Sequence, residues 1–516
     1  MLEAERVGIF NPEKPLQERC GIVAIYNPTD NIAEQLNIAL LAARGVWHRG
    51  QQGAGISMQT DSGIRKHTGT GSFEQVFSEE KIKDLQREGI NTWTLVHCRY
   101  GTSGGYQPEN LQPITVTTRE NDIVSIVHNG EFVNTPQMEK SISQKLPEGA
   151  SDTYLFAQLL ANQKGNNWDE RVLNALKEVN GAYSLAIGIN NELYLARDQF
   201  GIRPLVIGKI GGGWIAASET HALDKVGVAV TREIKRGEIL KLNKDGMKTL
   251  QKGFDGKGNF CDFELAYFSR PDSLFPPHTG FDESNHPETW RSVLSFREAC
   301  GRMLAIESPI PNATFAVGIP DSGTAVTTGY ANQLQIPYRQ VILRDHYDPN
   351  GSSRLFQGDN AIEAIGGRVL GKLSIVADPE IWEDAIVVVG DDSIVRGNVS
   401  QKITASLFAQ GAKEVHWISG FPQVRHPCHL GVSMRTQQEL IAARNDGDSK
   451  KIAEEIGATS VHYISHVGFI KARLGYKNIV MPKNPREIFL ANRGCGGCIT
   501  GLYPISKEGV VYASSK

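Results

Sequence analysis

The sequence predicts two folds in succession, an α+β sandwich in the first half of the chain and an α/β fold with a mainly parallel sheet in the second. From Gly21 to about Leu242, short apolar runs are separated by Gly, Asn and Asp, and helical stretches lie between them. Short strands punctuated by turns, with a few helices, are typical of a sandwich. Further along, apolar strands alternate with helical stretches, a pattern that predicts a parallel sheet binding ligands at the carboxyl ends of its strands.

Each expected element has its own pattern. The expected strands of the first half are the runs CGIVAIYN, TLVHCRYGT, DIVSIVHNG, YSLAIGI, ELYLARD and GWIAASET, with helices over 33–44 and 153–161. Those of the second half are ATFAVGIP, YRQVIL, AIVVVG and EVHWISG, with helices over 323–334 and 399–410. Residues 243–260 are rich in Gly, Lys and Asp and mark a boundary. We therefore predict a leader over 1–19, a first domain over 20–255 and a second over 256–516.

Composition excludes several classes of protein. At 516 residues the chain exceeds one ordinary hydrophobic core. Its 54 Lys and Arg against 57 Asp and Glu give a net charge of −3, without the basic excess of a nucleic-acid-binding protein. No apolar run reaches the length of about 18 residues that a membrane span needs, and residues 1–19 are too charged for a secretory signal. Seven cysteines, an odd number, favour a reducing compartment. We predict a cytoplasmic protein with neither nucleic-acid nor membrane partners.

Cys20 directly precedes the first expected strand, where a lone cysteine is most often a small buried side chain. Four polar motifs follow it and change this interpretation: HRGQQGAGIS from His48, HCRYGTSG from His97, HNGEFVN from His128 and SDTYLF from Ser151. Together they resemble the class II glutamine amidotransferase domain. The resemblance implies an N-terminal-nucleophile hydrolase fold, an αββα sandwich.

The resemblance implies that Cys20 is the nucleophile and that its own α-amino group, whose ordinary pKa is near 8, is the base. Residues 1–19 would then be a leader that must be removed. Asn129 and the backbone N–H of Gly130 would stabilise the oxyanion that forms on attack.

Three further residues would hold glutamine, by the same resemblance. Arg99 and Thr102 would bind the α-carboxylate, and Asp152 would bind the α-ammonium group. Asp152 also has the position of a helix N-terminal cap.

The segment AIVVVGDDSIVRGNVS, residues 385–400, is the clearest motif of the second half. A buried strand ends in two acids, and a loop then opens a helix whose N-terminus offers backbone N–H groups to a phosphate. A capped turn is the alternative interpretation. The whole segment resembles the phosphoribosyl pyrophosphate (PRPP) loop of type I phosphoribosyltransferases. The resemblance implies PRPP contacts from Asp391, Asp392, Ser393, Ile394, Val395, Arg396, Gly397 and Asn398, and a Mg²⁺ site at Ser322, Asp391 and Asp392.

A glutaminase domain followed by a PRPP site resembles the glutamine PRPP amidotransferase family, which is also supported by ARDQFGIRPL, FELAYFSRPDS and ELIAAR. The family implies an amidophosphoribosyltransferase with glutamine and PRPP as substrates: ammonia released from glutamine passes to PRPP and gives 5-phosphoribosylamine, the first committed step of purine biosynthesis. A homotetramer is implied as well. Two alternatives stay open, a paralogue that feeds ammonia to another phosphoribosyl or sugar-phosphate acceptor, and a non-catalytic PRPP or nucleotide sensor.

One departure motivates the paralogue. The family carries a basic loop after the third strand of its transferase half, and here the corresponding 343–359 stretch, LRDHYDPNGSSRLFQGD, is longer and less basic. Tyr347 is retained, and Arg354 and Phe356 would partly replace the remaining residues. Gly390 also stands where a bulkier apolar residue is usual.

The remaining cysteines predict the subclass. Cys495 and Cys498 form a C-x-x-C, which is half of a four-ligand metal site. Cys261 and Cys428 fall where iron–sulfur members of the family carry their other two ligands, so the resemblance implies a 4Fe-4S cluster. Zinc or no metal is the open alternative. Cys98 and Cys300 match neither site and are predicted to be structural.

Overall fold

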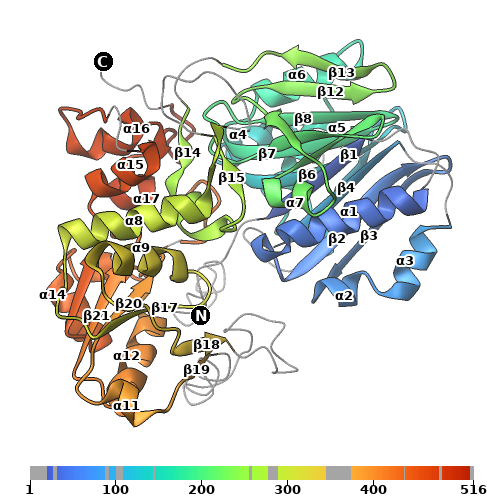
Figure 1. Cartoon of the computed structure of the whole chain (residues 1–516). Helices are drawn as coiled ribbons and strands as arrows, with labels where there is room; N and C mark the ends of the chain where they lie inside the picture. The colour runs from blue at the N-terminus through green and yellow to red at the C-terminus, as the bar shows by residue number, and fades with distance from the viewer. Residues whose placement is uncertain are drawn as a thin grey trace, which may run out of the picture. The chain divides into compact units, whose positions relative to one another are not determined.

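The computed structural model describes residues 20–26, 32–87, 92–99, 108–142, 146–254, 258–276, 289–344, 373–434, 436–475 and 479–511. The chain divides into two compact units (Figure 1). The first takes in described residues up to Phe296 together with 428–433 and 473–511, and the second is built from 297–427 and 434–472. The units are defined by compactness, and the boundary between residues 255 and 256 stays a prediction.

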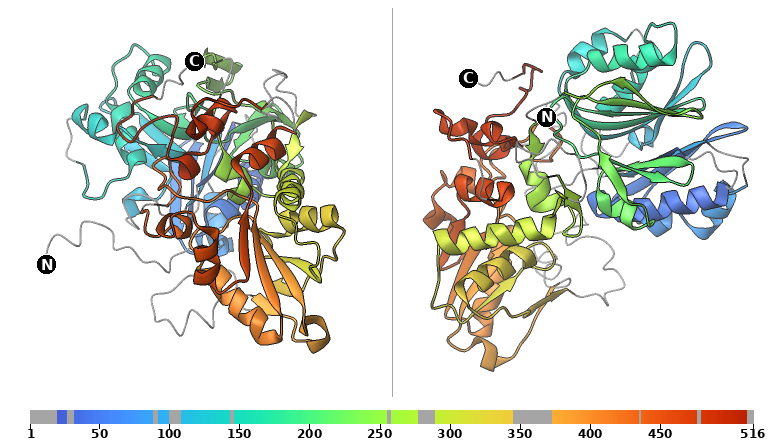
Figure 2. Two further views of the ribbon diagram at one scale, coloured as in Figure 1. Left: turned by 90° about the vertical axis from the view of Figure 1, so that its left-hand side faces the viewer. Right: turned by 45° about the horizontal axis from the view of Figure 1, so that its top comes forward.

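The first unit is a four-layer αββα sandwich, visible at the right of Figure 2. One antiparallel sheet has the spatial order β11 (Val230–Glu233), β9 (Val206–Ile210), β10 (Gly213–Ala217), β1 (Gly21–Tyr26), β4 (Trp93–Arg99), β2 (Gly53–Thr60), β3 (Gly63–Thr70). The other has the order β13 (Gly246–Gln251), β12 (Ile239–Asn243), β8 (Glu192–Arg197), β7 (Gly181–Ile189), β6 (Ile123–Phe132), β5 (Ile114–Thr117). The predicted α+β sandwich is confirmed.

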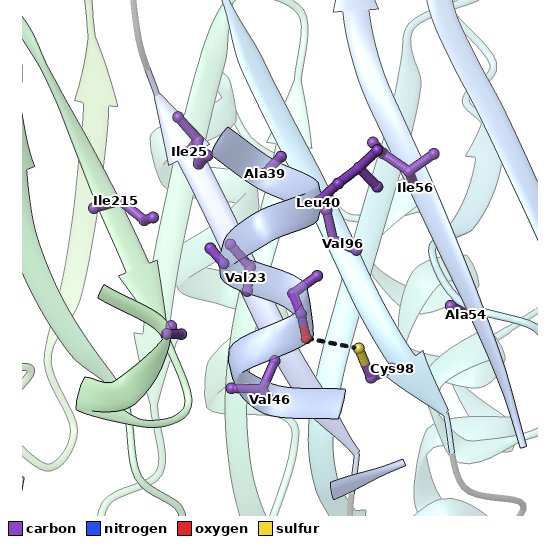
Figure 3. Packing of buried hydrophobic residues seen from close by; sticks show 14 of the residues in the cluster. Val23, Ile25, Ala39, Leu40, Val46, Ala54, Ile56, Val96, Cys98 and Ile215 are labelled. Atoms are coloured by element: carbon purple, nitrogen blue, oxygen red, sulfur yellow. Dashed lines mark hydrogen bonds between the residues drawn. The ribbon is translucent and has the colours of Figure 1, made fainter. Parts of the chain in front are cut away.

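Three hydrophobic clusters hold these layers together. The facing surfaces of the two sheets share one core, with Ile22, Trp93 and Val127 in it. Helix α1 (Ile32–Val46) packs on the outer face of the first sheet through alanines and leucines that meet β1 and β2 (Figure 3). Helices α5 (Asp152–Ala161) and α6 (Trp168–Lys177) cover the second sheet. Complete burial of both sheet faces explains the continuous apolar runs in β1 and β7.

Shorter elements complete this unit. They are α2 (Phe73–Val76), α3 (Glu79–Leu85), α4 (Thr135–Lys140), α7 (Thr220–Asp224), β14 (Phe260–Cys261), a π-helix (Glu264–Phe268), β15 (Leu274–Phe275), β16 (Arg291–Ser292), α16 (Ile488–Ala491), β23 (Gly494–Cys495) and α17 (Gly497–Thr500). Residues 243–251, the first part of the stretch 243–260 that is predicted to mark the boundary, form the end of β12, the turn and the second strand of the β12–β13 hairpin.

The second unit has a parallel sheet with the order β17 (Phe315–Gly318), β20 (Ile386–Asp391), β21 (Glu414–Ser419), β22 (Ser460–Tyr463). Its helices are the larger part of α8 (Val293–Glu307), α9 (Thr324–Leu334), α11 (Pro379–Trp382), α12 (Asn398–Gln410), α13 (Ile441–Arg444), α14 (Ser449–Ile456) and most of α15 (His466–Leu474). The predicted parallel sheet is confirmed. The run YRQVIL is an exception, because β18 (Ile342–Arg344) pairs antiparallel with β19 (Leu373–Ile375) outside that sheet.

Helices α8 and α9 lie side by side (Figure 1). Their backbones approach so closely that a Cβ at Gly301 would lie 1.9 Å from the Val326 carbonyl oxygen, and one at Gly329 would lie 2.0 Å from that of Glu298. This packing fixes α9, whose N-terminus follows the turn after β17 at the carboxyl end of the parallel sheet.

Candidate active site

Cys20 lies directly before β1, and its carbonyl oxygen accepts a hydrogen bond of 3.2 Å from Nε of Arg49. The Arg49 side chain is fully buried, and its Nη1 lies 2.5 Å from carboxylate oxygens of both Glu219 and Glu264. Burial lowers the pKa of Arg49, but the two carboxylates outweigh this effect and raise it. Arg49 is therefore a permanent cation that fixes the backbone at Cys20.

Asn129 and Gly130 lie next to each other in β6, between β7 and the edge strand β5 of the second sheet. The Nδ2 atom of the buried Asn129 is 3.5 Å from Oγ of Ser218, which accepts a 3.1 Å hydrogen bond from the backbone N–H of Ile22. Asn129 is thus linked through one hydroxyl to β1, two residues beyond Cys20. A Cβ at Gly130 would lie 1.9 Å from the carbonyl oxygen of Ala182, so only glycine fits there.

Arg99 and Asp152 share a second polar network. Arg99 ends β4, and its guanidinium donates to the carbonyl oxygen of Asn110. The side-chain oxygen of Asn110 accepts a 2.8 Å hydrogen bond from the Ser151 N–H. One Asp152 oxygen accepts from the backbone N–H of Phe132 at 3.0 Å. The predicted cap at Asp152 is wrong: the Ser151 hydroxyl caps α5, and Asp152 is its first residue.

Two buried histidines flank this network. Burial lowers the pKa of His97 well below its usual value, with the nearby Arg99 adding to the effect. Burial also lowers the pKa of His128, although Asp152 opposes it. Both imidazoles are therefore neutral near pH 7. Burial raises the pKa of Cys98, whose thiol donates to the Ala43 carbonyl oxygen at 3.5 Å within the α1 core (Figure 3).

The acidic pair of the second motif lies at the carboxyl end of β20. Oδ1 of Asp391 accepts hydrogen bonds from the Ser322 hydroxyl at 2.8 Å and from the Asp392 N–H at 2.9 Å. The hydroxyl of Ser393 donates to Oδ1 of Asp392 at 2.8 Å, while the buried Oδ2 of Asp392 has no partner among the described residues.

Burial raises the pKa of Asp391 well above its usual value, and the adjacent Asp392 adds to the effect. Burial likewise raises the pKa of Asp392 to about 6, with Arg297 opposing. The buried carboxylate of Asp392, the half-buried carboxylate of Asp391 and the Ser322 hydroxyl form a hard oxygen donor set that fits Mg²⁺. Arg297, on α8 and almost fully buried, was not found by sequence analysis, because a lone arginine in a helical pattern carries no signal.

The loop after the acids is held from the other side by the segment that contains ELIAAR. The carbonyl oxygen of Val395 accepts from the Ile441 N–H at 2.8 Å, and that of Arg396 accepts from the Arg444 guanidinium at 2.7 Å. The side chain of Arg396 forms an ion pair with Glu439. The ELIAAR segment, whose resemblance to the family carried no role, therefore holds the loop that follows the acids.

Gly397 precedes α12 with a φ of +87°, and a Cβ there would lie 2.4 Å from Cδ1 of Ile441. The N-cap residue of α12 is Gly397, which has no side chain with which to cap the helix, and the N-terminus of a helix is a favourable place for a phosphate. Ile394 and Val395 are buried apolar side chains, which restricts any phosphate contact they make to their backbone. Gly390, the departure from the family pattern, accommodates α9: a Cβ there would lie 1.9 Å from Oγ1 of Thr327.

The structure brings the four predicted cysteine ligands together within the first unit. Cys261 and Cys495 are direct partners in the parallel β14–β23 pair, and Cys498 lies on α17. Burial raises the pKa of Cys495 and of Cys498 far above the usual value, and the neighbouring thiols, those of Cys261 and Cys428 included, add to it.

Backbone donors point at two of these sulfurs. The N–H of Leu430 is 3.4 Å from Sγ of Cys428, and that of Gly497 bonds to the sulfur of Cys495. Within the described ranges, no group of three or more His, Cys, Asp or Glu side chains is arranged so that it could hold a metal ion.

Some predicted site residues fall outside the described residues. They are Thr102, the leader over 1–19, and Tyr347, Arg354 and Phe356 of the altered loop. Over the part of the chain that the structure covers, no helix is long and apolar enough to cross a bilayer.

Known amidophosphoribosyltransferases are similar to this chain over nearly its whole length. A family model for a glutamine amidotransferase domain matches residues 103–225. The amidophosphoribosyltransferase of Bacillus subtilis is 33% identical, over 95% of this chain and 95% of the relative. The human amidophosphoribosyltransferase is 31% identical, over 98% of this chain and 100% of the relative.

A solved structure of the glutamine PRPP amidotransferase of B. subtilis, complexed with ADP and GMP, matches this fold with a TM-score of 0.79 and 31% identity, covering 95% of this chain and 99% of that one. The αββα sandwich of antiparallel sheets and the parallel-sheet unit are therefore the N-terminal-nucleophile glutaminase and type I phosphoribosyltransferase folds. At this identity and coverage, the chain belongs to the amidophosphoribosyltransferase family.

Proposed function

We propose that this chain is a glutamine-dependent amidophosphoribosyltransferase that releases ammonia from glutamine and transfers it to PRPP, giving 5-phosphoribosylamine, pyrophosphate and glutamate. The observation that carries the proposal is the presence of both half-reaction sites in one chain. In the first, Ser218 links Asn129 to Ile22, two residues after Cys20. In the second, the paired acids precede a helix whose N-cap residue is Gly397. The full-length similarity to amidophosphoribosyltransferases supports the same function.

The glutaminase step uses Cys20 as the nucleophile. Its sulfur attacks the carboxamide carbon of glutamine, and its α-amine takes the thiol proton and passes it to the nitrogen that leaves as ammonia. Water then hydrolyses the thioester to glutamate. Asn129 Nδ2 and the Gly130 N–H stabilise the oxyanion, and each such donor is typically worth about 3 kcal/mol.

Binding of glutamine falls to charged groups around this site. Arg99 and Thr102 bind the α-carboxylate, and Asp152 binds the α-ammonium group. The α-amine can act as the base only when residues 1–19 have been removed, so the active chain starts at Cys20. The first domain then runs over 20–255 and the second over 256–516.

In the transferase step, ammonia displaces pyrophosphate from C1 of PRPP. Residues 391–398 bind the phosphoribosyl group through Asp391, Asp392 and the backbone of the loop. A Mg²⁺ ion held by Ser322, Asp391 and Asp392 would neutralise the pyrophosphate leaving group. The unpartnered, buried Oδ2 of Asp392 supports this assignment.

We assign Cys261, Cys428, Cys495 and Cys498 to a 4Fe-4S cluster. The thiols of Cys261 and Cys428 lie close enough to raise the pKa of Cys495 and Cys498, and four thiolates are the usual ligand set of such a cluster. Backbone N–H groups also bond to the sulfurs of Cys428 and Cys495. Zinc, which four thiolates also bind, is the alternative that metal analysis separates. We further propose a homotetramer in the cytoplasm.

Two variants separate the half-reactions. Cys20→Ala is expected to lose glutamine-dependent product and keep ammonia-dependent product, and Asp392→Asn is expected to lose both while still hydrolysing glutamine. Cys98→Ala, a buried cysteine in the same sheet as β1, is the control and keeps all activities. Intact mass of the parent protein should correspond to a chain starting at Cys20. Glutamine-dependent product from Cys20→Ala would refute the proposal.

A further inference from the structure

The loop that follows Cys428 packs on the glutaminase site. Residues 428–433 belong to the same compact unit as the two antiparallel sheets. A Cβ built at Gly431 would lie 3.1 Å from the carbonyl carbon of Gly130 and 3.2 Å from its oxygen. Gly431 therefore lies close to the carbonyl group of Gly130, the residue whose N–H the proposed function assigns as an oxyanion donor.

Gly431 cannot be replaced without disturbing this contact. Its φ is +96°, a conformation that other residues adopt only with strain. A Cβ there would also lie 2.4 Å from Nη2 of Arg203. Arg203 is fully buried and donates from the same Nη2 to the carbonyl oxygen of Leu430. The loop is thus held between Gly130 and a buried guanidinium.

A chain of polar contacts connects Arg203 to the nucleophile. Its Nη1 lies 3.7 Å from Oε2 of Glu264, whose other oxygen lies 2.5 Å from Arg49. Arg49 in turn donates to the carbonyl oxygen of Cys20. The three side chains are fully buried, so none of these charges is screened by solvent. A continuous set of polar contacts therefore joins the 428–433 loop to the backbone of the nucleophile, and Gly431 in the same loop packs close to Gly130.

We propose that the 428–433 loop is a positioning element of the glutaminase reaction. Gly431 packs against the carbonyl group of Gly130 and so holds the residue that carries the donor N–H. Arg203 fixes the loop and, through Glu264 and Arg49, the backbone of Cys20. The inference rests on the proposed function. It predicts that the loop affects transition-state stabilisation more than glutamine binding, because an oxyanion donor acts on charge that develops only during attack.

The test is Gly431→Ala compared with Gly246→Ala. Gly246 has a similar φ of +108° in the β12–β13 turn, with no atom within 4 Å of a Cβ there, so it reports backbone strain alone. In Gly431→Ala we expect glutaminase kcat to fall at least ten-fold, with KM for glutamine within two-fold of the parent. Ammonia-dependent transfer and alkylation of Cys20 by iodoacetamide should be unchanged, because alkylation forms no oxyanion. Gly246→Ala should match the parent in all four.

Unchanged glutaminase kcat in Gly431→Ala, or equal losses in both variants, would overturn the inference. If Gly431→Ala does not fold, Arg203→Lys provides the measurement, because lysine keeps the charge but not the planar fork that contacts Leu430 and Glu264 together. The same fall in kcat is expected there, and parental kcat would overturn the inference. A parent protein without glutaminase activity would refute the proposed function instead, so the two failures are distinguishable.

Discussion

Buried charge surrounds the proposed nucleophile. Arg49, Glu219 and Glu264 are almost entirely shielded from solvent, and the Oε2 of Glu219 also accepts hydrogen bonds from the Arg270 N–H at 3.0 Å and the Ser273 hydroxyl at 2.7 Å. Removing one partner of such a buried pair typically costs about 3–5 kcal/mol, because the other charge stays buried and unpaired. This network therefore restricts movement of the Cys20 backbone. It also anchors the 270–273 segment to Glu219 through two hydrogen bonds.

His97 leads to a prediction about pH. It is fully buried, and its folded-state pKa lies well below the value of 6.5 expected when it is exposed. The folded state therefore binds this proton less tightly than the unfolded state, and its contribution to stability is complete above pH 6.5 and lost as pH falls below it. We expect His97→Asn to unfold with a weaker dependence of the melting temperature on pH between 5 and 6.5 than the parent. Identical pH dependences would contradict the assignment.

At the scale of the element, α12 and its preceding loop form the phosphate-binding part of the second unit. The helix begins after a glycine in the left-handed region and also ends at one, Gly411, with a φ of +112°. The two positions differ in their surroundings. A Cβ at Gly397 would lie 2.4 Å from Ile441, whereas the nearest atom to a Cβ at Gly411 is 3.8 Å away.

This difference gives a matched pair of variants. Gly397→Ala and Gly411→Ala should each lose about 1–3 kcal/mol of stability through backbone strain. Only Gly397→Ala should also raise KM for PRPP, because the displaced Ile441 holds the loop through the Val395 carbonyl oxygen. Denaturant unfolding and steady-state kinetics with ammonia measure the two effects. A raised KM in Gly411→Ala would show that strain in the helix, rather than the loop contact, determines binding.

At the scale of the whole molecule, distant segments complete the first unit. Residues 473–511 pack with the antiparallel sandwich although they follow the parallel-sheet unit in sequence. Asp262, which follows Cys261 in the chain, forms a buried ion pair of 2.9 Å with Arg473. Arg473 also donates to the carbonyl oxygen of Asn492. The four predicted cluster ligands, Cys261, Cys428, Cys495 and Cys498, thus come from three separate stretches of the chain within one unit.

A bound cluster should therefore stabilise the fold, because it binds the folded state far better than the unfolded one. We expect protein purified without oxygen to contain roughly four iron and four sulfide per chain. Cys498→Ser should lose most of both and unfold at a lower temperature, whereas Cys300→Ser should keep both. Zinc in place of iron and sulfide, or no metal at all, would refute the cluster.

Much of the fold and of the candidate site could be predicted from the sequence where the signal is local. The β1 and β20 strands, the loop with the paired acids, and the C-x-x-C are each defined by residues close together in the chain, since backbone geometry and periodicity depend on neighbours. Register and pairing are not local, and β18 was placed in the wrong sheet for this reason.

The sequence by itself determined the two fold classes, the nucleophile candidate, the acidic pair and the four cysteines, because each rests on a periodic pattern or on a motif long enough to resemble a family. Only the tertiary structure decided that Arg49 lies between Glu219 and Glu264, that Arg297 acts electrostatically on the acidic pair, and that Gly431 lies close to Gly130. The physical reason is that these long-range contacts depend on how the sheets pack, which decides which charges are buried together and which backbones come close. A single arginine or glycine in a sequence has no pattern that identifies its distant partner.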